Sequence, residues 1–211
     1  MLSFLLSVAN LLTMPRRSTL LTFMIIPTLH YFSICGRGEL ARLTAAAGGL
    51  QINDQAWSPA FDDSGGWRSG YGAIGEGMGF PPTMPILEMG DFKIFQSQAI
   101  ESYIASIAPA FADLTPEQRA RDLMFALIKA DINQPTEQLL FKKITGDDLK
   151  PIMAKNYAMV ESLLPAEGYV NGLQFPTMAD LAVVVIAKGC MPFQVGRNFY
   201  NNNIIVPYLS N

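Results

Sequence analysis

The fold is decided by residues 27–49, which read PTLHYFSICGRGELARLTAAAGG. The apolar and aromatic segment Thr28–Phe32 predicts a short strand. Residues 36–47 then place apolar side chains at helical spacing, namely Leu40, Leu43, Ala46 and Ala47. Gly48 and Gly49 provide the C-cap that ends such a helix. The globular part of the chain therefore starts with a strand followed by a helix.

A second strand and a glycine-rich loop are expected next. The segment Gln51–Ala56 predicts the strand. Residues 64–79 contain seven glycines in 16 positions, with Trp67 and Tyr71 between them, which predicts a mobile loop. This loop lacks the Gly-Lys-Ser/Thr ending of a phosphate-binding loop, so the sequence gives little support to nucleotide binding.

The following segment predicts a β-hairpin and then a helix. Two apolar runs, residues 85–89 and 92–95, flank a Gly-Asp turn. A helix is expected directly afterwards, with Ser97 as its N-cap and Pro109 beyond its end. The order of elements in this half of the chain is thus strand, helix, strand, loop, hairpin and helix.

Beyond Pro109 the pattern is helical. Residues 116–143 and 147–164 predict two helices, and Thr177 with Asp180 has the form of a capping box that starts a third. We therefore divide the chain into residues 1–26, a mixed domain at 27–109 and a helical domain at 115–211.

Composition narrows the classes of function. The 211 residues carry 15 Lys+Arg against 18 Asp+Glu, and this acidic balance without a basic run excludes the electrostatic surface of a nucleic-acid-binding protein. Cys35 and Cys190 give no disulfide framework, and a single His excludes a His-rich metal site. We expect a protein that uses no metal and resides in a reduced compartment, most simply the cytoplasm.

Residues 1–26 differ chemically from the rest of the chain. The first 38 residues contain no acidic side chain and three arginines, and residues 18–36 form an uncharged run of 19. A membrane-spanning helix needs about 20 apolar residues, and this run contains Pro27 and His30. A secretory signal would need a basic residue before its apolar stretch. We interpret residues 1–26 as either an organelle-targeting leader or an upstream extension, outside the folded domains.

Four segments, in this order, resemble the cytosolic glutathione transferases, most closely the sigma class, with the alpha and pi classes as neighbours. The segments are Leu29–Phe32 with Gly36–Leu43, Thr83–Glu88, Gln96–Ile100 and Thr177–Leu181. The resemblance covers about residues 27–188. It implies a thioredoxin-like N-terminal domain, an all-helical C-terminal domain and a homodimer. The last helices of the family have no counterpart in this sequence, so we expect a helical domain that is short at its C-terminal end.

The resemblance also implies roles for individual residues in binding glutathione. Tyr31 matches the catalytic tyrosine, whose hydroxyl stabilises the glutathione thiolate and lowers the pKa of the thiol. Met84 precedes the position of a cis proline, Pro85, and would pair its backbone with the cysteinyl part of glutathione. Ser97, beside Gln96, would bind the glutamyl carboxylate at a helix N-terminus.

Other assignments leave alternatives open. Trp67 is expected to contact the glycyl end of glutathione, with Trp57 as the competing candidate. Arg37 either lies beside the catalytic tyrosine as in the family or is a solvated charge at the helix start. The acidic residue through which one subunit reaches the glutathione of its neighbour would be Asp122 or Asp131.

Cys35 introduces a second chemistry. It lies at the helix start, where thioredoxin-like proteins place a nucleophilic thiol, although a small buried residue is the simpler interpretation beside Tyr31. Three functions are therefore weighed. The first is a glutathione transferase that conjugates small hydrophobic electrophiles in detoxification, with isomerase or peroxidase side activity. The second is a non-catalytic glutathione-binding or structural relative, and the third is a Cys35-dependent monothiol transferase. We expect the first.

Overall fold

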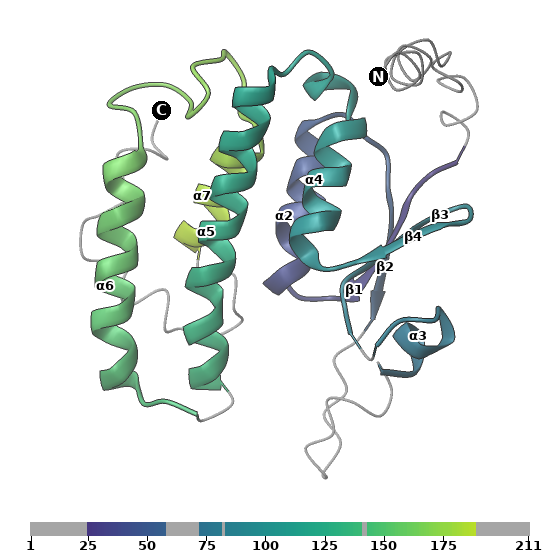
Figure 1. Cartoon of the computed structure of the whole chain (residues 1–211), viewed down its shortest axis with the longest axis horizontal. Helices are drawn as coiled ribbons and strands as arrows, with labels where there is room; N and C mark the ends of the chain where they lie inside the picture. Colours follow the sequence, from purple (N-terminus) through teal and green to yellow (C-terminus); the bar gives the residue numbers. More distant parts are fainter. Residues whose placement is uncertain (1–24, 58–71, 82, 141–142, 189–211) are drawn as a thin grey trace, which may run out of the picture.

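The computed structural model of the chain describes residues 25–57, 72–81, 83–140 and 143–188. Figure 1 shows a small sheet on one side of the molecule and a group of long helices on the other. The expectations for residues 1–24, for Trp67 and for residues 189–211 lie outside the described residues. Within the described part of the chain, no helix is both long enough and apolar enough to cross a membrane.

A four-stranded mixed sheet forms the first half of the molecule. Its strands are β1 (Thr28–Phe32), β2 (Asn53–Trp57), β3 (Ile86–Met89) and β4 (Phe92–Phe95), in the order β2-β1-β3-β4. β1 runs parallel to β2 and antiparallel to β3, and β3 pairs antiparallel with β4. Parallel strands need a crossover, which consists of the 3₁₀ turn η2 (Gly36–Gly38) and the helix α2 (Glu39–Ala47). The predicted strand–helix–strand order and the hairpin are confirmed.

Helices α2 and α4 (Ser97–Ile107) cover one face of this sheet, as Figure 1 shows. The side chains between helices and sheet are apolar and almost completely buried: Leu29, Ala41, Ala45, Leu87, Ile100 and Ile104. Successive strand residues point to opposite faces of a sheet. Tyr31, two residues after Leu29, therefore shares the face on which the helices pack.

Three long helices and a short 3₁₀ turn form the second half. They are η3 (Pro109–Phe111), α5 (Pro116–Leu140), α6 (Gly146–Leu163) and α7 (Met178–Lys188). α7 contacts both α5 and α2, and most of its residues are buried. Leu40 of α2 belongs to the same apolar core as the helical half. The two halves therefore share a continuous hydrophobic contact.

A buried polar network holds the start of α7 against α5. Oδ1 of Asp122 accepts hydrogen bonds from the Thr177 hydroxyl at 2.7 Å, the Asn171 amide at 3.0 Å and the Ala179 backbone N–H at 2.9 Å. Asp180 accepts the backbone N–H of Thr177 at 2.8 Å, which is one of the two hydrogen bonds of the predicted capping box. Asp122 is only 1% exposed. It cannot reach a neighbouring subunit, and that part of the prediction is wrong.

Two local predictions are also wrong. Within the glycine-rich segment that was predicted to be a loop, Gly72–Gly77 form the short helix α3. Gly75 serves close packing there, because a Cβ at this position would come within 2.6 Å of the Pro81 carbonyl oxygen. The second correction concerns α4, whose N-cap is Gln96 and whose first helical residue is Ser97.

Candidate functional site

Three of the predicted site segments end side by side at one edge of the sheet. Ile86 of β3 pairs with His30 of β1 on one side and with Phe95 of β4 on the other. Extended by one residue, this register places Tyr31 opposite Pro85 and Pro85 opposite Gln96. The sheet therefore brings together three segments that are far apart in the sequence.

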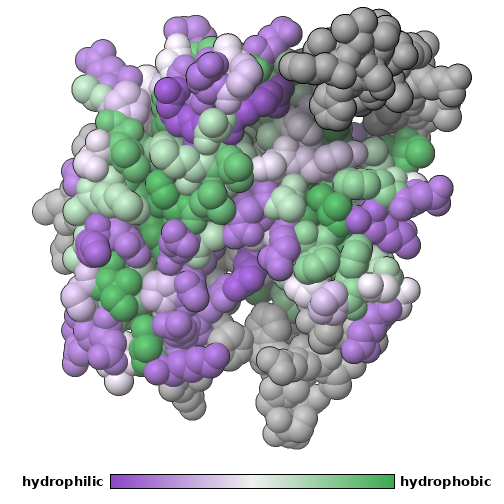
Figure 2. All heavy atoms as spheres, viewed as in Figure 1, coloured by the Kyte–Doolittle hydropathy of each residue, from purple (hydrophilic) through white to green (hydrophobic). Residues whose placement is uncertain are grey.

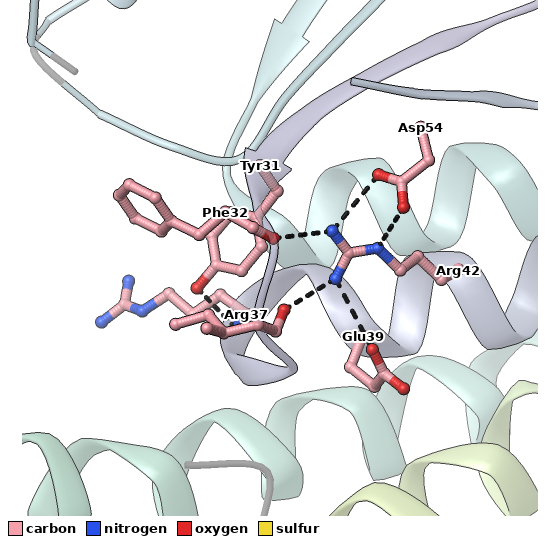
Figure 3. Close-up of polar contacts among 7 residues, drawn as sticks. Tyr31, Phe32, Arg37, Glu39, Arg42 and Asp54 are labelled. Atoms are coloured by element: carbon pink, nitrogen blue, oxygen red, sulfur yellow. Dashed lines mark hydrogen bonds and ion pairs between the residues drawn. The ribbon is translucent and has the colours of Figure 1, made fainter. Parts of the chain in front are cut away.

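Tyr31 is buried near the end of β1, with its hydroxyl directed toward η2 (Figure 3). Its Oη accepts a hydrogen bond from the backbone N–H of Arg37 at 2.9 Å. A Cβ on Gly36 would come within 2.6 Å of this Oη, and a Cβ on Gly38 within 2.4 Å of Cδ1. Gly36 also has a φ of +54°, which residues with a side chain rarely adopt. Contact with the tyrosine explains why glycine stands on both sides of Arg37.

The Tyr31 hydroxyl is arranged as a hydrogen-bond donor. Because its oxygen accepts the Arg37 N–H, the single hydroxyl proton remains to be donated elsewhere. Burial raises the pKa of Tyr31, and the hydrogen bond and charge of Arg37, together with the charge of Arg42, oppose this only in part. Tyr31 therefore stays protonated at neutral pH, where it can donate to an anion but cannot act as a base.

Arg37 connects this site to the helical half of the molecule. Its Nε donates to Oε1 of Glu137 at 2.6 Å and its Nη2 donates to Oε2 at 2.5 Å, which forms a two-pronged ion pair with α5. This pairing raises the pKa of Arg37. Arg37 therefore has a charged partner from another element, and 48% of its side chain is also exposed to solvent. Glu137 was not predicted, because only the packing of α5 brings it near.

Arg42 of α2 binds acceptors from neighbouring elements (Figure 3). Its Nη2 donates to the Phe32 carbonyl and its Nη1 to the Ile34 carbonyl, both at 2.8 Å. Its Nε donates to Oδ2 of Asp54, on β2, at 2.8 Å. Arg42 belongs to a segment that carries the family resemblance, yet nothing local in the sequence indicates which carbonyls it would bind.

The other predicted glutathione contacts have unusual backbone features. The peptide bond between Met84 and Pro85 is cis, as the resemblance implies. Gln96 has a φ of +77° and is the one non-glycine residue with a positive φ in the described ranges. This conformation is strained for a residue with a Cβ. Ser97 is buried in the first turn of α4, where a helix presents N–H groups without intrahelical partners.

Three remaining candidates, Cys35, Trp57 and Asp131, belong to the described residues. Cys35 is exposed in the turn between β1 and η2, so the expectation of a small buried residue is wrong. Trp57 ends β2 and pairs in register with Phe32. Asp131 is exposed on α5. The described residues contain no group of three His, Cys, Asp or Glu side chains that could hold a metal ion.

No protein-family model and no curated protein matches the sequence. Solved structures do match it. A glutathione S-transferase from Ascaris lumbricoides aligns with a TM-score of 0.59 at 23% identity, over 88% of this chain and 96% of that chain. A Pi-class glutathione S-transferase from Onchocerca volvulus gives 0.60 at 22%, over 83% and 86%. A glutathione transferase homologue from Drosophila mojavensis, with bound glutathione, gives 0.60 at 19%, over 87% of each chain.

At these identities the likeness establishes the fold. A thioredoxin-like domain built on β1–β4 is followed by an all-helical domain that contains α5, α6 and α7. The chain has the fold of the glutathione transferases. The predicted fold class is confirmed.

Proposed function

We propose that this protein is a glutathione transferase in which Tyr31 stabilises the thiolate of glutathione for attack on a small hydrophobic electrophile. The Tyr31 hydroxyl carries this proposal, because its oxygen accepts the Arg37 N–H and its proton is left for a ligand. The fold supports it as well, since one of the matching structures was solved with bound glutathione. By its motifs we place the protein nearest to the sigma class.

The proposed chemistry needs a stabilised anion. A free thiol has a pKa of about 8.5, so only a few per cent of it is thiolate at neutral pH. A positioned hydroxyl donor favours the anion and lowers the pKa of the thiol. The thiolate then attacks the electrophile: a carbon–sulfur bond forms, and the leaving group departs with its electron pair.

The rest of glutathione would lie along the same edge of the sheet. We assign its cysteinyl backbone to Met84, before the cis proline, and its glutamyl carboxylate to Gln96 and Ser97 at the start of α4. Trp67 or Trp57 would contact the glycyl end. These assignments rest on the family resemblance and on the register that aligns the three strand ends.

Replacing Tyr31 with Phe is expected to raise the pKa of the bound thiol by about 1–2 units, because the hydroxyl donor is lost. The turnover of an electrophile should fall about 100-fold or more. The ultraviolet absorbance of bound glutathione thiolate, recorded against pH, measures the first effect. Cys35→Ser is the matched control and should leave the thiolate titration unchanged. An unchanged titration in the Tyr31 variant would refute the proposal.

We also propose that the protein forms a homodimer through α5. Three large apolar side chains are exposed within little more than one turn of this helix: Leu123, Met124 and Leu127. Figure 2 shows an apolar area over α5 and α6 on the face in view. Exposed apolar patches mark interaction surfaces.

A role in detoxification in the cytoplasm completes the proposal. Profiling of the electrophiles that the protein conjugates would test the role, and localisation in cells would test the compartment.

A second function is favoured by one observation, the exposure of Cys35 beside the Tyr31 turn. As a monothiol transferase, the Cys35 thiolate would attack a mixed disulfide of glutathione and release the other thiol. A second glutathione would then reduce the Cys35–glutathione disulfide and yield glutathione disulfide. Loss of disulfide reduction in Cys35→Ser, with full activity in Tyr31→Phe, would favour this function over conjugation.

A further inference from the structure

The guanidinium group of Arg42 makes four hydrogen bonds and a further ion pair. Nε donates to Asp54 at 2.8 Å, and Nη2 is shared between the Phe32 carbonyl at 2.8 Å and Asp54 at 3.2 Å. Nη1 donates to the Ile34 carbonyl at 2.8 Å and lies 3.5 Å from Oε2 of Glu39. Because the five donors form a rigid planar fork, these contacts hold the group in one place.

The two carbonyls that Arg42 binds belong to the turn that follows Tyr31. Phe32 is the next residue after Tyr31, as Figure 3 shows. In the sequence, Ile34 lies midway between Tyr31 and Arg37. The path of this turn decides where the Arg37 N–H stands. That N–H is the group that donates to Tyr31 Oη at 2.9 Å. Arg42 thus binds the turn that carries the Arg37 N–H, and this N–H orients the Tyr31 hydroxyl.

Arg42 also acts on the tyrosine through its charge. Its Cζ lies 5.7 Å from the centroid of the Tyr31 ring, which is within the range of a cation–π contact. The positive charge lowers the pKa of Tyr31, against the larger opposing effect of burial. The placement of the turn and the effect of the charge are separate contributions, and an experiment can separate them.

We propose that Arg42 is a positioning residue for the Tyr31 hydroxyl. By holding the Phe32 and Ile34 carbonyls, it keeps the Arg37 N–H on the acceptor side of Oη, so that the hydroxyl proton points to the ligand. The inference rests on the proposed function for the identity of that ligand. The placing of the hydroxyl itself can be measured without any ligand.

Arg42→Lys tests the geometry while it keeps the charge. A lysine has three donors on one atom and cannot bind both carbonyls and Asp54 together. The weakened Arg37–Tyr31 hydrogen bond should raise the pKa of Tyr31 by about 1 unit, and Arg42→Met, which also removes the charge, should raise it further. The titration is followed by NMR of ring-labelled tyrosine in the protein without glutathione, with the Tyr31 signal assigned by its loss in Tyr31→Phe.

Arg119→Lys is the matched control. Arg119 likewise holds backbone carbonyls, those of Ala105 at 3.4 Å, Phe111 at 2.7 Å and Ala112 at 3.1 Å, where α4 leads into η3. Both lysine variants should lower the urea midpoint of unfolding, and only Arg42→Lys should move the Tyr31 titration. If Arg42→Lys loses stability but keeps the wild-type Tyr31 titration, Arg42 has only a structural role and the inference is overturned.

Measurements with glutathione separate this inference from the proposed function. With glutathione bound, Arg42→Lys should raise the pKa of the thiol and lower kcat more than it raises KM, because thiolate stabilisation is lost. A shifted Tyr31 titration in Arg42→Lys, with an unchanged bound thiolate in Tyr31→Phe, would overturn the proposed function and leave the positioning role intact. A wild-type Tyr31 titration in Arg42→Lys, together with a raised thiol pKa in Tyr31→Phe, would overturn the positioning role and leave the proposed function intact.

Discussion

Gly38 has no room for a side chain, because a Cβ there would come within 2.4 Å of Cδ1 and 2.7 Å of Cγ of Tyr31. Its φ of −89° is one that any residue adopts, so the restriction is purely steric. The contact is with the part of the ring nearest the backbone, which cannot swing away. A change at Gly38 must therefore move either Tyr31 or the turn.

Gly38→Ala is expected to lower the free energy of unfolding by about 1–3 kcal/mol, the usual range for overpacking. It should also displace the Tyr31 hydroxyl and raise the pKa of any thiol bound to it. Urea denaturation and thiolate absorbance measure the two effects. Gly146→Ala is the control, since a Cβ there would meet no atom within 4 Å. Wild-type values for both quantities in Gly38→Ala would contradict the assigned contact.

The residues of the site were predictable only to the extent that a local pattern marks them. Tyr31 and the Gly-Arg-Gly sequence lie together in one segment, so the sequence identified them. The direction of the hydroxyl proton was not predictable, because it depends on the Arg37 N–H reaching Oη. The exposure of Cys35 was also missed, since the turn and not the residue type decides it.

A buried ion pair joins the helices α4 and α5. Nζ of Lys129 donates to Oε1 of Glu101, and both side chains are almost completely buried. Oε2 of Glu101 has no hydrogen-bond partner in the described part of the chain. Burial raises the pKa of Glu101 to about 7, because the loss of water outweighs the attraction of Lys129.

Stability should therefore depend on pH through Glu101. The unfolded chain releases this proton near pH 4.5 and the folded protein near pH 7. Between these values the folded state binds more protons, so its stability falls as pH rises to about 7 and is level above that. Glu101→Gln abolishes this contribution, so the free energy of unfolding of wild type relative to the variant should fall by about 2 kcal/mol between about pH 5 and pH 8.

Urea denaturation at several pH values measures this dependence. Glu161→Gln changes an exposed carboxylate on α6 and serves as the control, with the wild-type dependence on pH. The same slope in wild type and in Glu101→Gln would show that Glu101 is not the group responsible.

The elements themselves followed largely from the sequence. The period of the apolar residues located α2, α4, α5 and α6 and all four strands, because burial of one face depends mainly on local spacing. Within the glycine-rich segment the error concerns Gly75, which packs against the Pro81 carbonyl in a way that glycine content alone does not indicate. The Glu101–Lys129 pair was not predicted, because single charged residues in helices are normally exposed.

At the scale of the whole molecule, α5 links the halves of the chain on one side and exposes apolar side chains on another. Glu137 of α5 binds Arg37 beside Tyr31, and Lys129 binds Glu101 of α4. Leu127, in contrast, is 48% exposed. In a dimer formed through α5, the helix at the interface would therefore also carry Glu137 and Lys129, one residue of each ion pair.

Leu127→Asp is expected to produce a monomer, because a charge would be placed in the proposed apolar interface. Light scattering measures the mass, which for wild type should be about twice the 23.1 kDa of the chain. Phe92→Asp changes a similarly exposed apolar residue on β4 and should remain a dimer. A monomeric wild-type protein would contradict the proposed dimer, and a dimeric Leu127→Asp would place the interface elsewhere.

The sequence by itself determined the order of elements, the strand–helix start and the segment that contains Tyr31, because these depend on residues close together in the chain. The tertiary structure alone decided that Glu137 binds Arg37, that Arg42 holds the turn after Tyr31 and that Asp122 is buried beneath Thr177. Each of these contacts joins different elements, and no local spacing specifies which side chains meet when helices pack on a sheet. The donor state of the Tyr31 hydroxyl belongs with them, since it depends on burial and on a hydrogen bond made only in the folded chain.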